Sequence, residues 1–213
     1  MSEYYAGLDL GQSRDFTALA IVEWTQLPGE WDAAAYAHRK VDAVRLRHLE
    51  RVALGTPYPD VVARVARVMR SPALAAGRRS LAADATGVGR PVVDLLRRAN
   101  LGCALWPVLI TGGHTESSGQ GFYHVPKRDL IIGLQVLLQR GELQIAAGLA
   151  HGEALVREMA EMRVRVTGEG REQYGVWREG EHDDLVLAVA LACWGLRRVR
   201  REVGCGERTR RLL

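Results

Sequence analysis

The chain has 213 residues, of which 47% are hydrophobic and 25% charged, and its formal net charge is +4. This length and composition allow one substantial core, so they predict a single folded domain and exclude a largely disordered protein. No apolar run approaches the roughly 20 residues that span a bilayer, and the N-terminus lacks a signal-peptide pattern, so we expect a cytoplasmic protein with no membrane partner.

The excess of basic residues and the spacing of the cysteines indicate which partners and sites to expect. A sequence pI near 9.2 is compatible with a polyanionic partner, although it is weak evidence alone. Cys103, Cys193 and Cys205 fit neither a disulfide framework nor a metal-binding spacing. We therefore expect no cysteine-based site.

The first part of the chain has the pattern of antiparallel strands. Tyr5–Leu10 and Thr17–Trp24 are apolar and are separated by turn residues, which predicts a hairpin. Leu27–Glu30, with its Pro-Gly pair, is predicted to end the second strand, and Ala34–Leu46 is predicted to form a third.

Strands then alternate with helices along the rest of the chain. The predicted elements are a helix led by Pro59 with its apolar face at Val61–Met69, a strand at Ser80–Asp84, a helix at Arg90–Ala99, a strand at Ala104–Ile110, a loop at Thr111–Tyr123, a helix at Pro126–Arg140, a short edge strand at Leu143–Ile145, a helix at Leu149–Met162, a hairpin at Arg163–Trp177 and a helix at Asp184–Arg200. Antiparallel strands that lead into βαβ units predict an α/β fold with a mixed sheet, three antiparallel strands followed by parallel ones, and helices on both faces. We assign residues 1–200 to one domain and residues 201–213 to a basic C-terminal tail.

Aspartates lie at the edges of three apolar segments. Asp9 and Asp84 end predicted strands, and Asp183 and Asp184 open the last helix. Neighbouring strands lie about 4.8 Å apart, so parallel pairing would bring the first two carboxylates to one sheet edge. Oxygen ligands of this kind suit Mg²⁺, and two ions about 3.5–4 Å apart suit in-line phosphoryl displacement. Each aspartate also has an ordinary explanation as a turn or helix-capping residue, but their combination favours a metal site.

Four stretches with these acids follow one another in a specific order. They are Gly7–Gly11 with Asp15–Ala18, Asp84–Gly89, Val125–Leu130 and Gly180–Ala188. In this order they closely resemble the C-terminal nuclease domain of phage large terminase subunits, and the resemblance extends to about Arg200. It implies a ribonuclease H-like fold.

The resemblance also implies roles for individual residues. Catalytic roles would belong to Asp9, Asp15, Asp84, Lys127, Asp183 and Asp184. Asp9, Asp84 and Asp184 would bind Mg²⁺ or Mn²⁺, as two ions, with Asp183 as an auxiliary ligand ranked below Asp184. Asp15 would be a further acid near the metals, and Lys127 a phosphate contact or a charge partner of the transition state.

The implied activity is cleavage of double-stranded DNA by metal-activated water during viral genome packaging in the host cytoplasm. Besides DNA, the implied partners are a terminase ATPase segment, the small terminase subunit and the portal protein. The sequence contains no Gly-x-x-x-x-Gly-Lys-Ser/Thr motif, so ATP-driven translocation is not expected of this polypeptide. We expect either the nuclease part of a longer or split terminase or a free-standing relative.

Other interpretations stay open at this point. One alternative is a Holliday-junction resolvase of the same fold superfamily, and another is a DNA-binding or packaging-motor module that keeps these acids without catalysis. Gly7–Ser13 is also similar to the phosphate loop of actin-like ATPases and sugar kinases, but those proteins need two such domains. His182 is a candidate ligand or general base, but local packing at the start of the helix is the favoured explanation.

Overall fold

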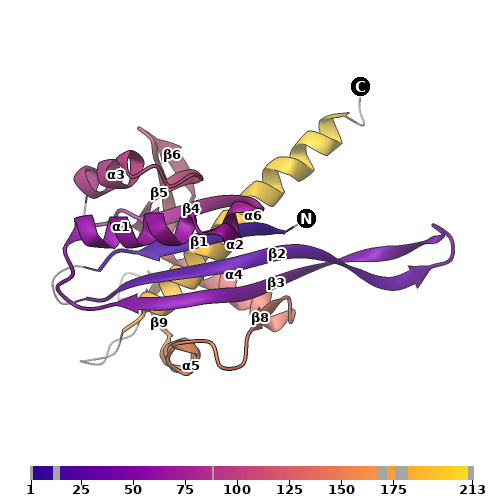
Figure 1. The fold of residues 1–213 in the computed structure, drawn as a ribbon. Helices are drawn as coiled ribbons and strands as arrows, with labels where there is room; N and C mark the ends of the chain where they lie inside the picture. The colour runs from indigo at the N-terminus through magenta and orange to yellow at the C-terminus, as the bar shows by residue number, and fades with distance from the viewer. Residues whose placement is uncertain (1, 12–14, 88, 167–171, 176–181, 211–213) are drawn as a thin grey trace.

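A mixed β-sheet forms the centre of the computed structural model, which describes residues 2–11, 15–87, 89–166, 172–175 and 182–210 (Figure 1). The strands are β1 (Glu3–Asp9), β2 (Thr17–Asp32), β3 (Ala37–Val52), β4 (Arg78–Asp84), β5 (Ala104–Thr111), β6 (Ser117–Gly119), β7 (Phe122–Pro126), β8 (Leu143–Ile145), β9 (Arg163–Val166) and β10 (Glu172–Gly175). The helices are α1 (Tyr58–Met69), α2 (Pro72–Ala75), α3 (Gly89–Arg98), α4 (Lys127–Gln139), α5 (Gly152–Glu161) and α6 (Asp184–Arg210).

The main sheet has the spatial order β6-β7-β5-β4-β1-β2-β3-β8. β1, β2 and β3 are antiparallel neighbours, whereas β4 runs parallel to β1, and β5 and β7 continue in parallel. The edge strand predicted at Leu143–Ile145 is present as β8, which pairs in parallel with β3. The expected mixed sheet is therefore confirmed.

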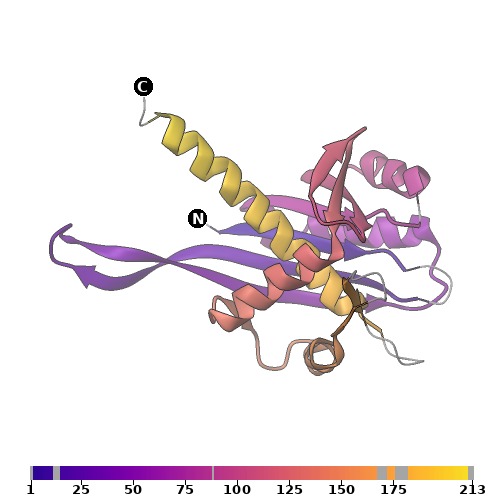
Figure 2. The same cartoon turned by 180° about the vertical axis from the view of Figure 1, so that it is seen from behind.

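Two large hydrophobic cores lie on opposite faces of this sheet. Side chains alternate between faces along a strand. Tyr5 of β1 accordingly belongs to the core that includes side chains of α4, α5 and α6, whereas Ala6 and Leu8 belong to the core that includes α1 and α3. Figure 2 shows α4 and α6 together on the first face. Helices thus cover both faces, as expected.

α6 lies directly against the sheet because β1 has a glycine where they meet. A Cβ atom at Gly7 would lie 2.0 Å from the carbonyl oxygen of Ala188 and 2.5 Å from the amide nitrogen of Ala192. The first turns of α6, Leu185–Trp194, are buried on every side. This contact fixes the start of α6 relative to the end of β1.

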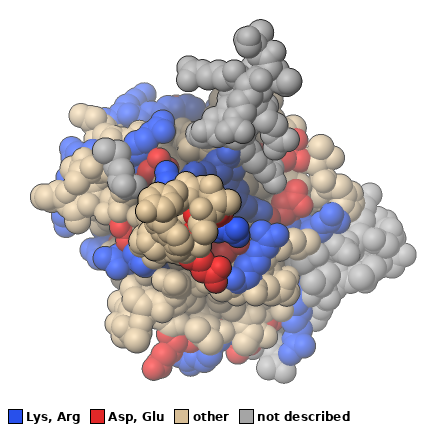
Figure 3. Space-filling model, turned by 90° about the vertical axis from the view of Figure 1, so that its right-hand side faces the viewer, with Lys and Arg blue, Asp and Glu red and all other residues tan. Residues whose placement is uncertain are grey.

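β2 and β3 extend beyond the sheet as a two-stranded arm. The prediction that Leu27–Glu30 ends the strand is wrong, because β2 continues through Pro28 and a bulge between Pro28 and Trp31. Proline is tolerated there because the arm has a free edge. β3 begins later than predicted and runs on to Val52. The arm points away from the start of α6 (Figure 1), and Figure 3 shows Lys and Arg around it with Asp and Glu among them.

Three further segments differ from the sequence prediction or extend it. Thr111–Tyr123 is not a continuous loop, because β6 lies within it and β7 begins at Phe122. These strands are too short to show a periodic pattern. α6 continues to Arg210, although the helix was expected to end at Arg200. The predicted hairpin is confirmed by the antiparallel pair β9 and β10, and residues 167–171 and 176–177 of the predicted range lie outside the described residues.

Within the described part of the chain, no helix combines the length and the apolar character that crossing a membrane requires.

Glu50 links the end of β3 to α1 and gives the fold a predictable acid sensitivity. Arg64 donates two hydrogen bonds to it, at 2.6 and 3.0 Å. Burial by itself would raise the pKa of Glu50, but the hydrogen bonds and charges of His48 and Arg64 lower it from 4.5 to about 2. The native state therefore gains stability above the unfolded pKa and loses it as the pH falls from about 4.5 to about 2.

We expect Glu50→Gln to lower the free energy of unfolding at pH 7 by about 1 kcal/mol, a value reduced because Arg64 is half exposed. Urea denaturation at pH 7 and pH 3 measures this difference, which should shrink at the lower pH. Glu30→Gln on the exposed arm serves as the control. An equal difference at both pH values would contradict the proposed ion-pair effect.

Candidate metal centre

Asp9 and Asp84 meet at the carboxyl edge of two neighbouring parallel strands. Asp9 is the last residue of β1 and Asp84 the last of β4, and the register pairs Leu8 with Ala83 directly before them. Both aspartates are buried, with 9% and 8% of their surface exposed. The structure thus brings together the two carboxylates that the sequence places at strand ends.

Burial perturbs both acids, and repulsion from neighbouring acids adds to this effect at Asp9. Burial raises the pKa of Asp9 far above its ordinary value, and the charges of Asp84, Asp183 and Asp184 raise it further. Burial also raises the pKa of Asp84, against the lowering effect of hydrogen bonds from Thr86 and Asp9. The positive charge of Lys127 lowers the pKa of both acids but does not cancel the rise. This cluster has more negative charge than its neighbours balance.

The start of α6 brings two more aspartates to this edge. Nζ of Lys127, at the start of α4, donates to Oδ2 of Asp183 at 2.7 Å. Each of these two side chains keeps about a quarter of its surface exposed, whereas Asp184 is buried with 5% of its surface exposed. The structure thus groups five of the six predicted catalytic residues.

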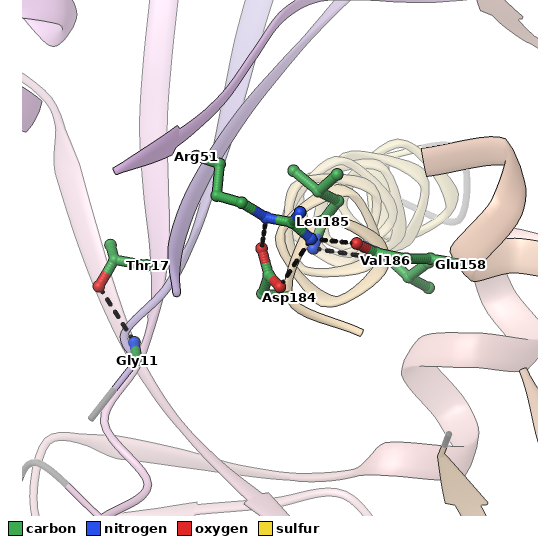
Figure 4. A network of polar contacts seen from close by, with 7 residues as sticks. All are labelled: Gly11, Thr17, Arg51, Glu158, Asp184, Leu185 and Val186. Carbon is green, nitrogen blue, oxygen red and sulfur yellow. Dashed lines mark hydrogen bonds and ion pairs between the residues drawn. The ribbon is translucent and has the colours of Figure 1, made fainter. Parts of the chain in front are cut away.

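Arg51 of β3 holds Asp184 with a two-pronged ion pair (Figure 4). Its Nε donates to Oδ2 of Asp184 at 2.8 Å, and its Nη2 donates to Oδ1 at 2.9 Å. Nη2 also bonds to Glu158 of α5. Both partners keep only a small part of their side chains exposed, 6% for Asp184 and 7% for Glu158. Arg51 therefore connects a candidate metal ligand to a buried second acid.

Glu158 also caps α6. Its Oε2 accepts hydrogen bonds from the backbone amides of Leu185 and Val186, at 3.1 and 3.2 Å (Figure 4). These are the second and third amides of the helix, the donors that an N-cap aspartate at position 183 would bind. The capping explanation for Asp183 is therefore wrong for these two amides.

Sequence reasoning missed Arg51 and Glu158. Arg51 ends a basic stretch in which no single arginine stands out. Glu158 had a usable signal, because it lies three residues after Leu155 and four before Met162, on the apolar face of α5. A glutamate on the buried face of a helix needs a partner.

A side-chain hydrogen bond forms just after the end of each of the two strands. Oγ1 of Thr17 accepts from the amide of Gly11 at 3.1 Å (Figure 4), and the amide of Thr86 donates to Oδ1 of Asp84 at 2.7 Å. The second bond shows that Asp84 does shape a turn, as the ordinary explanation requires. It uses one carboxylate oxygen for that purpose.

Asp15 and His182 have surroundings that differ from those of the grouped acids. Asp15 is exposed at a bend before β2, unlike the buried and half-buried aspartates described above. The ring of His182 packs edge-on against Phe16, with 5.0 Å between ring centroids. The guanidinium of Arg51 lies 4.8 Å from the centre of the same Phe16 ring. His182 thus has the local packing role that the sequence left open.

The donor set fits a hard divalent cation. Its donor atoms are carboxylate oxygens, which Mg²⁺ and Mn²⁺ prefer, and a cation would offset the repulsion that raises the pKa of Asp9. In the described ranges, however, no three His, Cys, Asp or Glu side chains are already arranged to hold a metal ion. Asp183 and Asp184 face Lys127 and Arg51 instead. These acids therefore have the chemistry of a metal site, with two of them paired to protein cations.

Comparisons with known proteins identify the fold. No protein-family model matches the sequence, and no curated protein matches it. Among solved structures, the magnesium-bound large terminase nuclease from thermophilic phage G20c matches with a TM-score of 0.62 and 21% identity, over 90% of this chain and 80% of that chain. A second structure of that nuclease matches with a TM-score of 0.60 and 19% identity, over 90% of this chain and 81% of that chain.

The large terminase nuclease domain of Thermus phage P74-26 matches with a TM-score of 0.59 and 19% identity, over 90% of this chain and 78% of that chain. These similarities show that the chain has the ribonuclease H-like fold of large terminase nuclease domains, which confirms the expected fold class.

Proposed function

We propose that this protein is a metal-dependent endonuclease that cleaves double-stranded DNA, as in viral genome packaging by terminase. One observation carries the proposal: Asp9, Asp84, Asp183 and Asp184 converge from three separate elements on one sheet edge, with an excess of negative charge. A fold shared with a magnesium-bound terminase nuclease supports it.

Asp9, Asp84 and Asp184 would hold the ions, which we propose to be two Mg²⁺ or Mn²⁺, with Asp183 as an auxiliary ligand. Bound divalent ions supply a Lewis acid that polarises a phosphodiester and lowers the pKa of water. The burial of Asp9 and Asp84 keeps their carboxylates in fixed positions at the sheet edge.

Lys127 would contact the phosphate. It lowers the pKa of both Asp9 and Asp84, so its positive charge lies within reach of the same space. Its bond to Asp183 holds the ammonium at that edge. Asp15, which is exposed, would be a further acid near the metals.

Double-stranded DNA is the proposed substrate, and the basic pI is compatible with it. A terminase ATPase segment, the small terminase subunit and the portal protein are the proposed packaging partners. We place this activity in the host cytoplasm.

A plasmid assay tests the activity. We expect the wild type to nick or linearise supercoiled plasmid with Mn²⁺ or Mg²⁺ and to lose this activity in EDTA. Asp84→Asn should lower the cleavage rate by more than about 100-fold, because loss of even an outer-shell partner costs about 10- to 100-fold. Asp94→Asn, at an exposed aspartate of α3, is the matched control and should cleave normally.

The same assay separates the alternatives. A preference for four-way junctions over linear duplex would favour a resolvase, and DNA binding without cleavage under any divalent ion would favour a non-catalytic module. Strong metal-dependent cleavage by a folded Asp84→Asn variant would overturn the residue assignment.

A further inference from the structure

Arg51 binds the carboxylate of Asp184, for which a metal ion would compete. The fork of its guanidinium binds both oxygens of Asp184, at 2.8 and 2.9 Å. Only 18% of the Arg51 side chain is exposed, so this is a largely enclosed ion pair. In this geometry the carboxylate edge that faces Arg51 is not available to another cation.

The same guanidinium already has a second acidic partner, Glu158. Glu158 is buried beside it, bonds to Nη2 of Arg51 through Oε1, and uses Oε2 to cap α6. The Phe16 ring, 4.8 Å from the guanidinium, provides a flat surface against it. If Asp184 turned away, Arg51 would keep an acidic partner without leaving its site.

Glu158 also keeps the start of α6 in place during such a change. Its bonds run to the backbone of Leu185 and Val186 and not to the side chain of Asp184. The Asp184 side chain can therefore change partner while the helix stays anchored.

We propose that Arg51 is a displaceable internal cation: it binds Asp184 and Glu158 together in the metal-free protein, and it releases Asp184 and stays bound to Glu158 when a divalent ion takes up Asp184. This inference rests on the proposed metal site. Arg51 and Glu158 act through Asp184, so both are positioning residues. The exchange explains why no metal-holding group of three is preformed in the described residues, although four aspartates converge there.

Substitutions of Arg51 and of Glu158 should have opposite effects on the affinity for Mn²⁺. Calorimetric titration with Mn²⁺, without DNA, measures this directly. Arg51→Gln should bind Mn²⁺ about tenfold more tightly than the wild type. An adjacent Arg lowers the proton affinity of a carboxylate by about one to three powers of ten, and it should oppose the binding of another cation in the same way. Glu158→Gln should bind Mn²⁺ several-fold more weakly, because Arg51 then has only Asp184 as its acidic partner.

A double variant separates the proposed change of partner by Arg51 from a direct effect of the Glu158 charge on Mn²⁺ binding. In Arg51→Gln/Glu158→Gln the guanidinium is absent, so the second change should leave the affinity of Arg51→Gln nearly unaltered. Matched controls are Arg47→Gln on the exposed side of β3 and Glu153→Gln on the exposed side of α5, which should shift Mn²⁺ affinity by less than about twofold. Melting curves in EDTA check that each variant is folded.

Each result has a clear consequence. Equal or weaker Mn²⁺ binding by Arg51→Gln, with normal binding by the wild type, overturns the exchange and leaves the nuclease proposal intact. Absence of Mn²⁺ binding in the wild type and in every variant overturns both. If Arg51→Gln does not fold, Arg51→Lys keeps the charge without the fork and should still bind Mn²⁺ more tightly than the wild type; weaker binding contradicts the proposal.

Discussion

Gly7→Ala is expected to lower the free energy of unfolding by about 3 kcal/mol or more, which corresponds to a fall in melting temperature of about 6–12 °C. The added methyl group would lie 2.0 Å from the carbonyl oxygen of Ala188 and 2.5 Å from the amide nitrogen of Ala192. Both atoms belong to the backbone of α6, so no side-chain rotation can relieve the overlap. The helix would have to move away from β1.

This movement would also affect the metal centre. Asp9 ends the strand that contains Gly7, and Asp184 begins the helix that would be displaced. We therefore expect the folded fraction of Gly7→Ala to lose Mn²⁺-dependent stabilisation. Differential scanning calorimetry with and without Mn²⁺ measures both effects in one experiment.

Gly112→Ala is a suitable control, because a Cβ atom there has no atom within 4 Å. It should change the melting temperature by no more than a degree or two. Near-normal stability of Gly7→Ala would mean that α6 does not lie against β1 as described.

The elements that could be predicted are those with a local signal. The apolar strand ends at Asp9 and Asp84 and the apolar run of α6 follow directly from residue order. The position of Asp84 beside Asp9 also follows once β1 and β4 are taken as parallel neighbours. Local pattern thus locates most of the proposed ligands.

The elements that could not be predicted depend on long-range contacts. Arg51 and Asp184 are 133 positions apart in the chain, and Arg51 and Glu158 are 107 apart. Their contact depends on the register of β3 and on the packing of α5 against α6, which no local pattern encodes. The predicted end of β2 was wrong for the opposite reason. The Pro-Gly pair is a local signal for a strand end, but pairing with β3 overrides it.

Asp9→Asn is expected to stabilise the metal-free protein, by about 2 kcal/mol or roughly 4–8 °C in melting temperature at pH 7. Burial and the charges of Asp84, Asp183 and Asp184 all disfavour the ionised form of Asp9. Asparagine has nearly the same shape but no charge, so the variant avoids this cost.

The effect should depend on pH in a defined direction. A carboxyl group whose native pKa lies above its unfolded value of 3.8 contributes stability below that value, and this contribution is lost as the pH rises through the native pKa. In EDTA, the wild type and Asp9→Asn should therefore differ little near pH 4, and the variant should become the more stable protein toward pH 7.

Mn²⁺ should reverse this order. Saturating Mn²⁺ should stabilise the wild type, by about 2.7 kcal/mol at 100 times the dissociation constant, and should leave Asp9→Asn unchanged. Asp42→Asn on the exposed arm is the control and should respond to Mn²⁺ as the wild type does. If Asp9→Asn is less stable than the wild type in EDTA, the ionised form of Asp9 is not disfavoured in the metal-free protein. There would then be no repulsion among these acids for a bound ion to relieve.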